Sequence, residues 1–336
     1  MQNIADRFEL DSDTSLPRAM PWYKFGTRLT EVFTAKDAVR AAKLDWEVIV
    51  VETGTGPTGH RLLVRDDVRS EDDPKRKLAE VRSDYQPIQN LDAFAFFDPI
   101  VKAGGAIYDC IGTAQEGRLI WMTVRMQREN EIAASDVVAR FVLLVYRHGT
   151  SGPIGSRGGK APTMSCKPVR LACKSTLDDG LLYPLVKVKV TPAGITELED
   201  SPSVALDKID RHFDELANRF RAMLRIQMSE IELRSYLDAV FPKAHASGVG
   251  KYRDPADRDR AIAECVRLFA EGKGNDLPAA KGSLWAAYSA VAEYVDYYET
   301  RPDDPQRLNE IWGSPLKTYA MGKATKVLLK SPDSAL

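Results

Sequence analysis

The stretch VVARFVLLVYRHGTSGPIGSRGGKAPTMSCKPVRLACKSTL, residues 137–177, opens with an apolar strand pattern and continues into a loop rich in Gly, Ser and Pro. It contains no Asp or Glu, although roughly six would be expected at the acid content of the whole chain. Its cations are Arg140, Arg147, Arg157, Lys160, Lys167, Arg170 and Lys174. Backbone N–H groups and positive charge suit a phosphate chain. A solvated surface loop is the alternative interpretation.

The positive charge of this stretch is local. The 336 residues contain 48 Asp and Glu against 47 Lys and Arg, for a net charge of −1. Any binding to nucleic acid must therefore come from a patch and not from overall charge. With 44% hydrophobic residues, the chain can build one large domain or two ordinary ones.

The cysteines and the hydropathy of the chain indicate in which cellular compartment it is expected. The four cysteines, Cys110, Cys166, Cys173 and Cys265, form no CxxC motif, and the first residues lack the apolar core of a signal peptide. We expect free thiols in a reducing cytoplasm. No apolar run approaches 18 residues, so no membrane span is expected.

The patterns along the chain predict an α+β fold. An antiparallel, β-rich N-terminal part with packed helices should be followed by an all-helical C-terminal part. We divide the chain into a loose segment at 1–21, a core domain at 22–200 with a basic loop at 147–174, and a helical region at 201–336. Strands are expected at 46–52, 61–65, 106–114, 118–125, 137–146, 169–173 and 185–190. Helices are expected at 35–44, 91–103, 204–241 (as one or two), 257–271 and 283–298, with a break at Pro99.

Motifs for catalysis or cofactors are weak. GTGPTGHR at 54–61 has the glycine spacing of a P-loop, but His60 and Arg61 stand where Lys and Ser/Thr are required, so we expect a hairpin turn and no nucleotide site. The four His are scattered, and Cys166 and Cys173 are too far apart for a zinc knuckle. We assign no catalytic residue, no metal site and no cofactor.

Aromatic residues alternate with cations in several places, as in WYKF at 22–25. Single strands bind by stacking on aromatic rings beside a cationic groove. In the strand at 118–125, Trp121 and Thr123 share one face, which we expect to be accessible, while Met122 and Val124 share the core face. The predicted nucleic-acid-binding residues are Arg147, His148, Arg157, Lys160, Lys167, Arg170, Lys174, Trp121 and Tyr85.

Several motifs, taken together, resemble a known family. They are MPWYKFGTRL, AAKLDWEV, VRSDYQPIQNLDAFAFFDPI, DVVARFVLLVYRHGTSG, PVRLACKSTL and GSLWAAYSAVAEYVDYY. This order is similar to the phage/plasmid-like family of laterally transferred proteins, a domain of unknown function, over about residues 20–325. The chain has His148–Gly149–Thr150–Ser151 where that family has HDGS, and Lys174 and Ser175 where it has Gln and Asn.

This resemblance implies a mobile-element context without supplying an activity. The layout also resembles single-strand annealing proteins of the Redβ, RecT and Erf type, which assemble as rings or filaments. We therefore expect a non-catalytic protein that binds single-stranded DNA, anneals it in recombination and forms a homo-oligomer. The alternatives are an interaction or scaffold protein and a metal-dependent nuclease.

Overall fold

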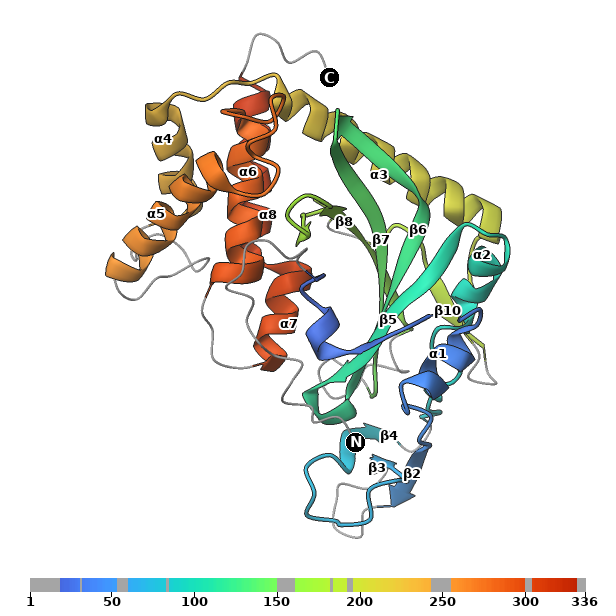
Figure 1. The fold of residues 1–336 in the computed structure, drawn as a ribbon. Coiled ribbons are helices and arrows are strands. Elements are labelled where there is room, and N and C mark those ends of the chain that lie inside the picture. Colours follow the sequence, from blue (N-terminus) through green and yellow to red (C-terminus); the bar gives the residue numbers. More distant parts are fainter. Residues whose placement is uncertain are drawn as a thin grey trace.

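The computed structural model describes residues 19–30, 32–52, 60–82, 85–149, 161–181, 184–191, 196–242, 255–299 and 304–330. The chain has an α+β fold, as predicted, with antiparallel sheets in the N-terminal half and helices in the C-terminal half. Figure 1 shows a long curved sheet at the centre, with helix α3 along one side and helices α4 to α8 on the other.

The central sheet has six strands in the order β1-β5-β6-β7-β8-β9, and all neighbours are antiparallel. Its strands are β1 (Thr27–Arg28), β5 (Ala106–Ala114), β6 (Leu119–Ala133), β7 (Asp136–Arg147), β8 (Thr163–Arg170) and β9 (Ser175–Thr176). Strands β5 and β7 lie where the sequence predicts them. The prediction of a continuous basic loop at 147–174 is wrong, because β8 occupies residues 163–170 and pairs with β7. The strand predicted at 169–173 is instead the end of β8 and a turn.

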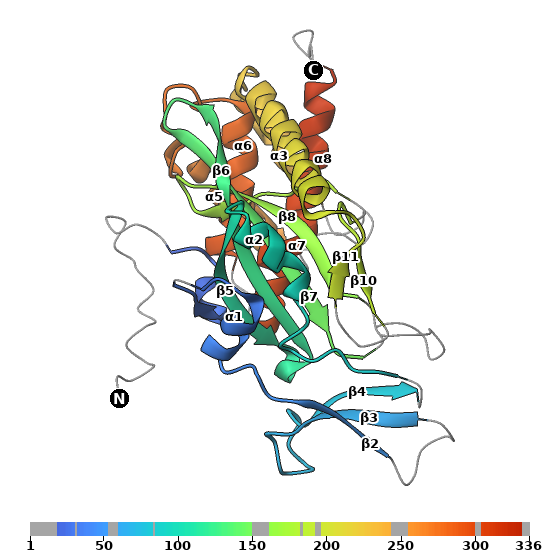
Figure 2. The same ribbon diagram turned by 90° about the vertical axis from the view of Figure 1, so that its right-hand side faces the viewer.

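Two smaller sheets complete the β structure. Strands β2 (Val48–Glu52), β3 (His60–Arg65) and β4 (Lys77–Arg82) form one meander, and β10 (Val188–Val190) pairs with β11 (Thr196–Leu198). The predicted hairpin of β2 and β3 is confirmed, while its turn at 53–59 lies outside the described residues. Figures 1 and 2 show the β2–β4 sheet projecting beyond one end of the central sheet.

The helices of the N-terminal half are short. They are η2 (Tyr23–Phe25), α1 (Ala35–Ala41), η3 (Ala95–Phe97), α2 (Asp98–Lys102) and η4 (Gln115–Gly117). Thr34 caps α1 by accepting a hydrogen bond from the N–H of Asp37. The break expected near Pro99 is confirmed, because Pro99 stands in the first turn of α2 and only a 3-10 turn precedes it.

The C-terminal half is helical, as predicted. Its helices are α3 (Pro202–Leu224), α4 (Glu230–Val240), α5 (Pro255–Glu271), α6 (Leu284–Glu293), the π-helical turn η5 (Tyr294–Tyr298), α7 (Asp304–Gly313) and α8 (Pro315–Leu328). The pattern at 204–241 is two helices, since Ser229 begins α4 with a capping box that includes Glu232.

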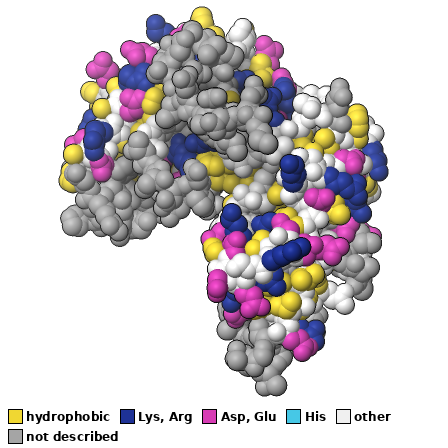
Figure 3. All heavy atoms as spheres, turned by 60° about the horizontal axis from the view of Figure 1, so that its bottom comes forward, with side chains coloured by type: hydrophobic (Ala, Val, Ile, Leu, Met, Phe, Trp, Pro, Cys, Tyr) yellow, Lys and Arg dark blue, Asp and Glu magenta, His cyan; other side chains and the backbone are white. Residues whose placement is uncertain are grey.

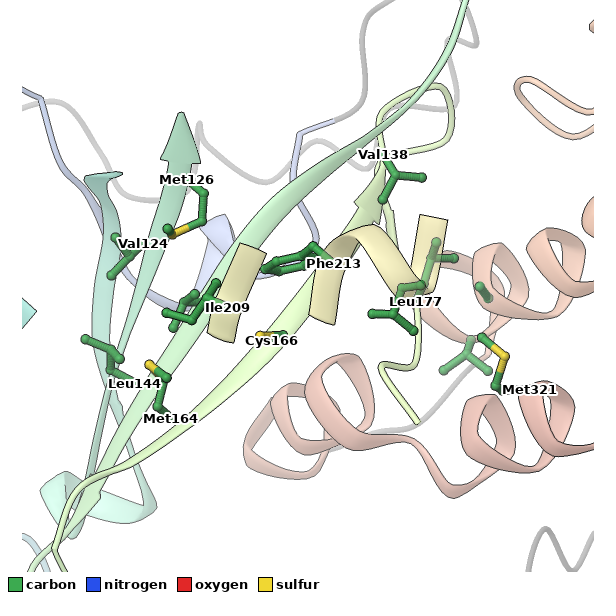
Figure 4. Packing of buried hydrophobic residues seen from close by; sticks show 14 of the residues in the cluster. Val124, Met126, Val138, Leu144, Met164, Cys166, Leu177, Ile209, Phe213 and Met321 are labelled. Atoms are coloured by element: carbon green, nitrogen blue, oxygen red, sulfur yellow. The ribbon is translucent and has the colours of Figure 1, made fainter. Parts of the chain in front are cut away.

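One apolar core joins the central sheet to the helical half. Ile209 and Phe213 on α3 point toward the sheet residues Val124, Leu144 and Cys166 (Figure 4). Because α3 repeats apolar residues at three- and four-residue intervals, its buried stripe runs along this side of the sheet. We call this side of the sheet the α3 face.

Candidate nucleic-acid interface

The cations of β7 and β8 divide between the two faces of the central sheet. Successive residues of a strand point to opposite faces. Arg140 and Arg170 therefore lie on the α3 face with Val142 and Cys166, whereas Arg147 and Lys167 lie on the opposite face. Register places Lys167 beside Phe141, and Arg147 is six residues further along β7, about 20 Å at the usual rise per residue.

Arg170 is part of a buried ion-pair network and has no exposed surface. Its guanidinium donates to both carboxylate oxygens of Asp136, at 2.8 and 2.6 Å, and to Oδ1 of Asn275 at 2.5 Å. Trp285 stacks on Arg170 and donates its indole N–H to Asp136 at 2.8 Å. The prediction that Arg170 contacts phosphate is therefore wrong, because surrounding protein atoms keep a phosphate from reaching its guanidinium.

Arg140 plays a similar part between the sheet and α3. Its guanidinium donates to Asn130 Oδ1 at 2.7 Å and Asp210 Oδ1 at 2.7 Å, and it pairs with Asp214. Arg128 also pairs with Asp210 at 2.9 Å. These contacts hold the pKa of Asp214 below its usual range against the opposing effect of burial, through hydrogen bonds from Asn130 and Arg140. Arg140 thus links β7 of the sheet to helix α3 through Asp210 and Asp214.

A third buried cation connects β9 to the last two helices. Lys317 pairs with Asp296, and Asp296 Oδ2 also accepts the main-chain N–H of Thr176 at 2.7 Å. Lys317 donates as well to the carbonyl of Ile311 at 3.2 Å. Burial lowers the pKa of Lys317 and raises that of Asp296, and the ion pair opposes both effects.

The face opposite α3 carries a cluster of aromatic rings, and we call it the aromatic face. Trp22 contacts Phe141 at 5.2 Å and Trp312 at 5.6 Å between ring centroids, and Trp121 contacts Trp312 at 5.1 Å. Gly112 makes room for Trp121, since a Cβ at Gly112 would stand 2.6 Å from the indole ring. The expectation that Trp121 is accessible is wrong: residues from 19–25 and α7 cover it and leave 1% exposed.

Partly exposed aromatic and cationic side chains surround that buried cluster. Tyr23, Phe25 and Trp312 pack against it while keeping some exposed surface. Arg28 stacks over Tyr23 at 4.5 Å, and Lys24 over Phe25 at 4.8 Å. Within the described ranges, neither Arg28 nor Lys167 has an ion pair, and Arg147 donates only to the amide oxygen of Gln115.

Asp109 fixes one side of the aromatic face. Its carboxylate accepts from the Tyr23 hydroxyl at 2.6 Å, the Thr123 hydroxyl at 2.8 Å and the Trp22 indole at 3.2 Å. Burial, together with the charge of Asp109, raises the pKa of Tyr23 far above its ordinary value. Tyr23 therefore stays protonated and oriented beside Arg28.

Among the other predicted binding residues, Tyr85 and His148 lie in one buried group with Tyr146, and Lys174 lies apart from them beside Tyr297. Lys174 is partly exposed and has a positive φ of 57°, and Tyr85 and His148 are buried near the β2–β4 sheet. Burial, with a smaller effect of Arg65, lowers the pKa of His148 to about 3, so this side chain is neutral at ordinary pH. Arg157 and Lys160 lie outside the described residues.

Sequence reasoning overlooked several residues of this interface. Tyr23 and Phe25 belong to the WYKF segment, where the alternation of aromatic residues with a cation was a usable signal. No sequence signal marked Arg28 or Trp312, because only the fold brings η2, β1 and α7 onto one face.

Among the described residues, no group of three or more His, Cys, Asp or Glu side chains could hold a metal ion. None of the helices in those ranges combines the length and the apolar character needed to cross a bilayer.

The chain matches the family described as a domain of unknown function, DUF932, over residues 77–312, and it belongs to that family. The matched region includes β5 to β9 and α3 to α6, hence both faces of the central sheet. Searches of curated proteins and of solved structures found no match.

Proposed function

We propose that this protein binds single-stranded nucleic acid along its aromatic face, without catalysis, as a mobile-element protein acting in strand annealing and recombination. The observation that carries the proposal is the placement of Arg28, Arg147 and Lys167, which form no ion pair within the described ranges, around the partly exposed rings of Tyr23 and Phe25. Single strands bind to such surfaces because their bases stack on aromatic rings and their phosphates contact nearby cations.

The dimensions of the face suit a short stretch of strand. Arg28 on β1 and Lys167 on β8 are separated by four strand spacings, about 19 Å at the usual distance between neighbouring strands. Figure 3, in which the lower end of Figure 1 comes forward, shows a hollow between the two halves of the molecule, bordered by Lys or Arg and by hydrophobic side chains. A face of this size contacts only about three or four phosphates, so one copy of the chain would bind a strand weakly. A homo-oligomer would bind more tightly, because several copies of the face would contact the same strand.

Fluorescence anisotropy with labelled single- and double-stranded DNA across a salt series tests this proposal, with light scattering on the same sample. We expect an oligomer that prefers single strands and whose affinity falls steeply with salt, because binding releases counterions. Absence of binding even at low salt would contradict the proposal and leave an interaction or scaffold role as the better account.

The basic loop itself can be tested in the same assay. Arg157→Ala with Lys160→Ala should flatten the salt dependence of single-strand binding if the loop between β7 and β8 also contacts phosphates. An unchanged slope in this double variant would confine the interface to the aromatic face.

A further inference from the structure

Helix α7 carries a buried cation that has no partner in the part of the chain that the structure describes. Arg307 is only 7% exposed, its Nη1 is buried without a hydrogen-bond partner, and within the described ranges its guanidinium forms no ion pair. The other buried cations of those ranges, Arg140, Arg170, Arg258 and Lys317, each pair with a carboxylate. Arg307 is therefore the exception among them.

Arg258 on α5 shows what ordinarily surrounds a side chain of this kind. It is exposed to the same 7%, and its guanidinium donates to the carbonyl of Phe241 and to Oδ1 of Asp238, each at 2.6 Å. Moving a charge out of water costs free energy unless an opposite charge and hydrogen bonds replace the water. The uncompensated guanidinium of Arg307 therefore indicates that an anion supplies its missing partner.

The position of α7 places Arg307 at the border of the aromatic face. Leu308, the next residue, and Ile311, one turn further along, belong to the buried cluster of that face together with Phe141 on β7. Lys167 lies on the same face, beside Phe141 in the register of β7 and β8. Arg307 and Lys167 thus approach one cluster from two elements, α7 and β8.

A third cation, Lys317, lies within electrostatic range of both. Its ammonium donates to the carbonyl of Ile311 at 3.2 Å and pairs with Asp296. Burial lowers the pKa of Lys317, and the charges of Lys167 and Arg307 lower it further, against the effect of Asp296. The ends of α7, α8 and β8 therefore bring three positive charges toward one place.

The carboxylates that interact with Lys317 do not compensate Arg307. Asp296 is the ion-pair partner of Lys317 itself. Asp178 interacts with Lys167 and Lys317, but burial raises its pKa, and the charge of Asp179 raises it further. Within the ranges that the structure describes, neither Asp296 nor Asp178 pairs with Arg307, so its positive charge is left for a ligand.

We propose that Arg307 and Lys167 bind a phosphate group at the border of the aromatic face. The guanidinium and the ammonium would donate charge-assisted hydrogen bonds to its oxygens. A phosphate is small, and the partly exposed side chains of Lys167 and Trp312 leave it an approach from the surface, so no enclosed cavity is required. Figure 3 shows Lys or Arg side chains along the hollow between the two halves of the molecule. A free phosphate and a phosphate of a strand present the same oxygens, so the site does not depend on the proposed function.

Isothermal titration with inorganic phosphate, in chloride buffer of constant ionic strength, tests the site. The wild-type chain should bind phosphate, and the affinity should fall by about tenfold or more in Arg307→Gln, because hydrogen bonds from a charged group are lost. Lys167→Gln should weaken binding in the same direction. The control Arg260→Gln removes an exposed charge from α5 and should bind as tightly as the wild-type chain. Absence of phosphate binding by the wild-type chain, or equal affinities in Arg307→Gln and Arg260→Gln, would overturn the proposal.

Melting temperatures in chloride show whether the charge of Arg307 is uncompensated in the folded chain. Arg307→Gln should leave the melting temperature unchanged or raise it, because it removes a buried charge without a partner. Arg258→Gln should lower it, because it removes the partner of Asp238 and of the Phe241 carbonyl. A fall in Arg307→Gln as large as that in Arg258→Gln would overturn the proposal.

Replacing chloride by phosphate at equal ionic strength adds a second measurement on the same variants. The melting temperature of the wild-type chain should rise more than that of Arg307→Gln, because a ligand that binds the folded chain stabilises it. Equal rises in both would show only the general effect of phosphate on protein stability and would contradict the site.

Oligothymidylate without terminal phosphates distinguishes the two sources of the phosphate. If Arg307→Gln loses affinity for this strand as it does for inorganic phosphate, the site takes a phosphodiester of a bound strand. If only the affinity for inorganic phosphate falls, the site takes a free phosphate; both results support it. Binding of phosphate but of no strand by the wild-type chain would refute the proposed function and leave the site standing, whereas strand binding without phosphate binding would do the reverse.

Discussion

The cations of the acid-free stretch differ in what surrounds them on the two faces of the sheet. On the α3 face, Arg170 and Arg140 are buried and neutralised by Asp136, Asp210 and Asp214. On the aromatic face, Arg147 and Lys167 are partly exposed and form no ion pair in the described ranges. Absence of acids along the sequence therefore does not mean absence of acids in space.

This contrast teaches how to separate structural charge from binding charge. A buried guanidinium stays in a fold only when carboxylates and hydrogen bonds compensate it, so its loss should appear as loss of stability. A cation without such partners contributes little to the fold and keeps its charge available to a ligand.

The largest effect is expected from Asp136→Asn, which leaves Arg170 buried beside a neutral amide. Removing one partner of a fully buried pair costs about 3–5 kcal/mol. Urea denaturation of the variant and the wild-type chain measures this loss of unfolding free energy. A change below about 1 kcal/mol would show that Arg170 is compensated by Asn275 and the Gly274 carbonyl alone, and it would weaken the comparison.

An effect of comparable size, spread over several pH units, is expected from the buried side chain of His148. The folded-state pKa of His148 is about 3 against 6.5 for the free side chain. The unfolded chain therefore binds one more proton between these values, so stability is full above pH 6.5 and falls as the pH is lowered toward 3. The expected slope from this residue is about 1.4 kcal/mol per pH unit.

His148→Phe isolates that contribution from the carboxylates and from His212, whose pKa burial also lowers. The variant should lose part of the decline in stability between pH 6.5 and pH 4, measured by denaturation at several pH values. Identical slopes in the variant and the wild-type chain would mean that His148 is not neutral and buried as described.

The smallest effect on stability is expected on the aromatic face. Lys167→Gln and Arg147→Gln should each change the unfolding free energy by less than about 0.5 kcal/mol, because neither side chain has an ion pair to lose. Differential scanning calorimetry of both variants, with Asp136→Asn measured for comparison, tests this expectation. A loss above about 2 kcal/mol from either substitution would place it among the structural cations.

Strand alternation explains both what the sequence predicted and what it missed. The strand predicted at 137–146 includes Arg140 but ends before Arg147, which β7 includes and alternation places on the opposite face. Starting the next strand at 169 instead of 163 left Lys167 in the loop and concealed its alternation with Arg170, since Gly, Ser and Pro nearby outweighed a short strand pattern. Trp121 shows the other limit: periodicity gives the face of a residue but not what covers that face, and here the cover comes from 19–25 and α7.

The buried group of Trp46, Tyr85, Asn90, Tyr146 and His148 could not be predicted from the sequence for the same physical reason. Its residues come from segments around positions 46, 85–90 and 146–148, and only the packing of the small sheet on the central sheet brings them together. Each segment was noticed as a motif, but no local pattern states that polar atoms of three segments share one buried space.

Binding of a single strand to the aromatic face should be visible in the salt dependence of affinity of two triple variants. Arg28→Gln, Arg147→Gln and Lys167→Gln together remove three charges from the aromatic face. Arg40→Gln, Arg211→Gln and Arg260→Gln remove three exposed charges from helices α1, α3 and α5. Because each contact with a single strand contributes about 0.7 to the slope of log affinity against log salt, the first variant should lose about 2 from that slope. We expect the second variant to retain the wild-type slope; equal slopes in the two variants would show that the aromatic face is not where the strand binds.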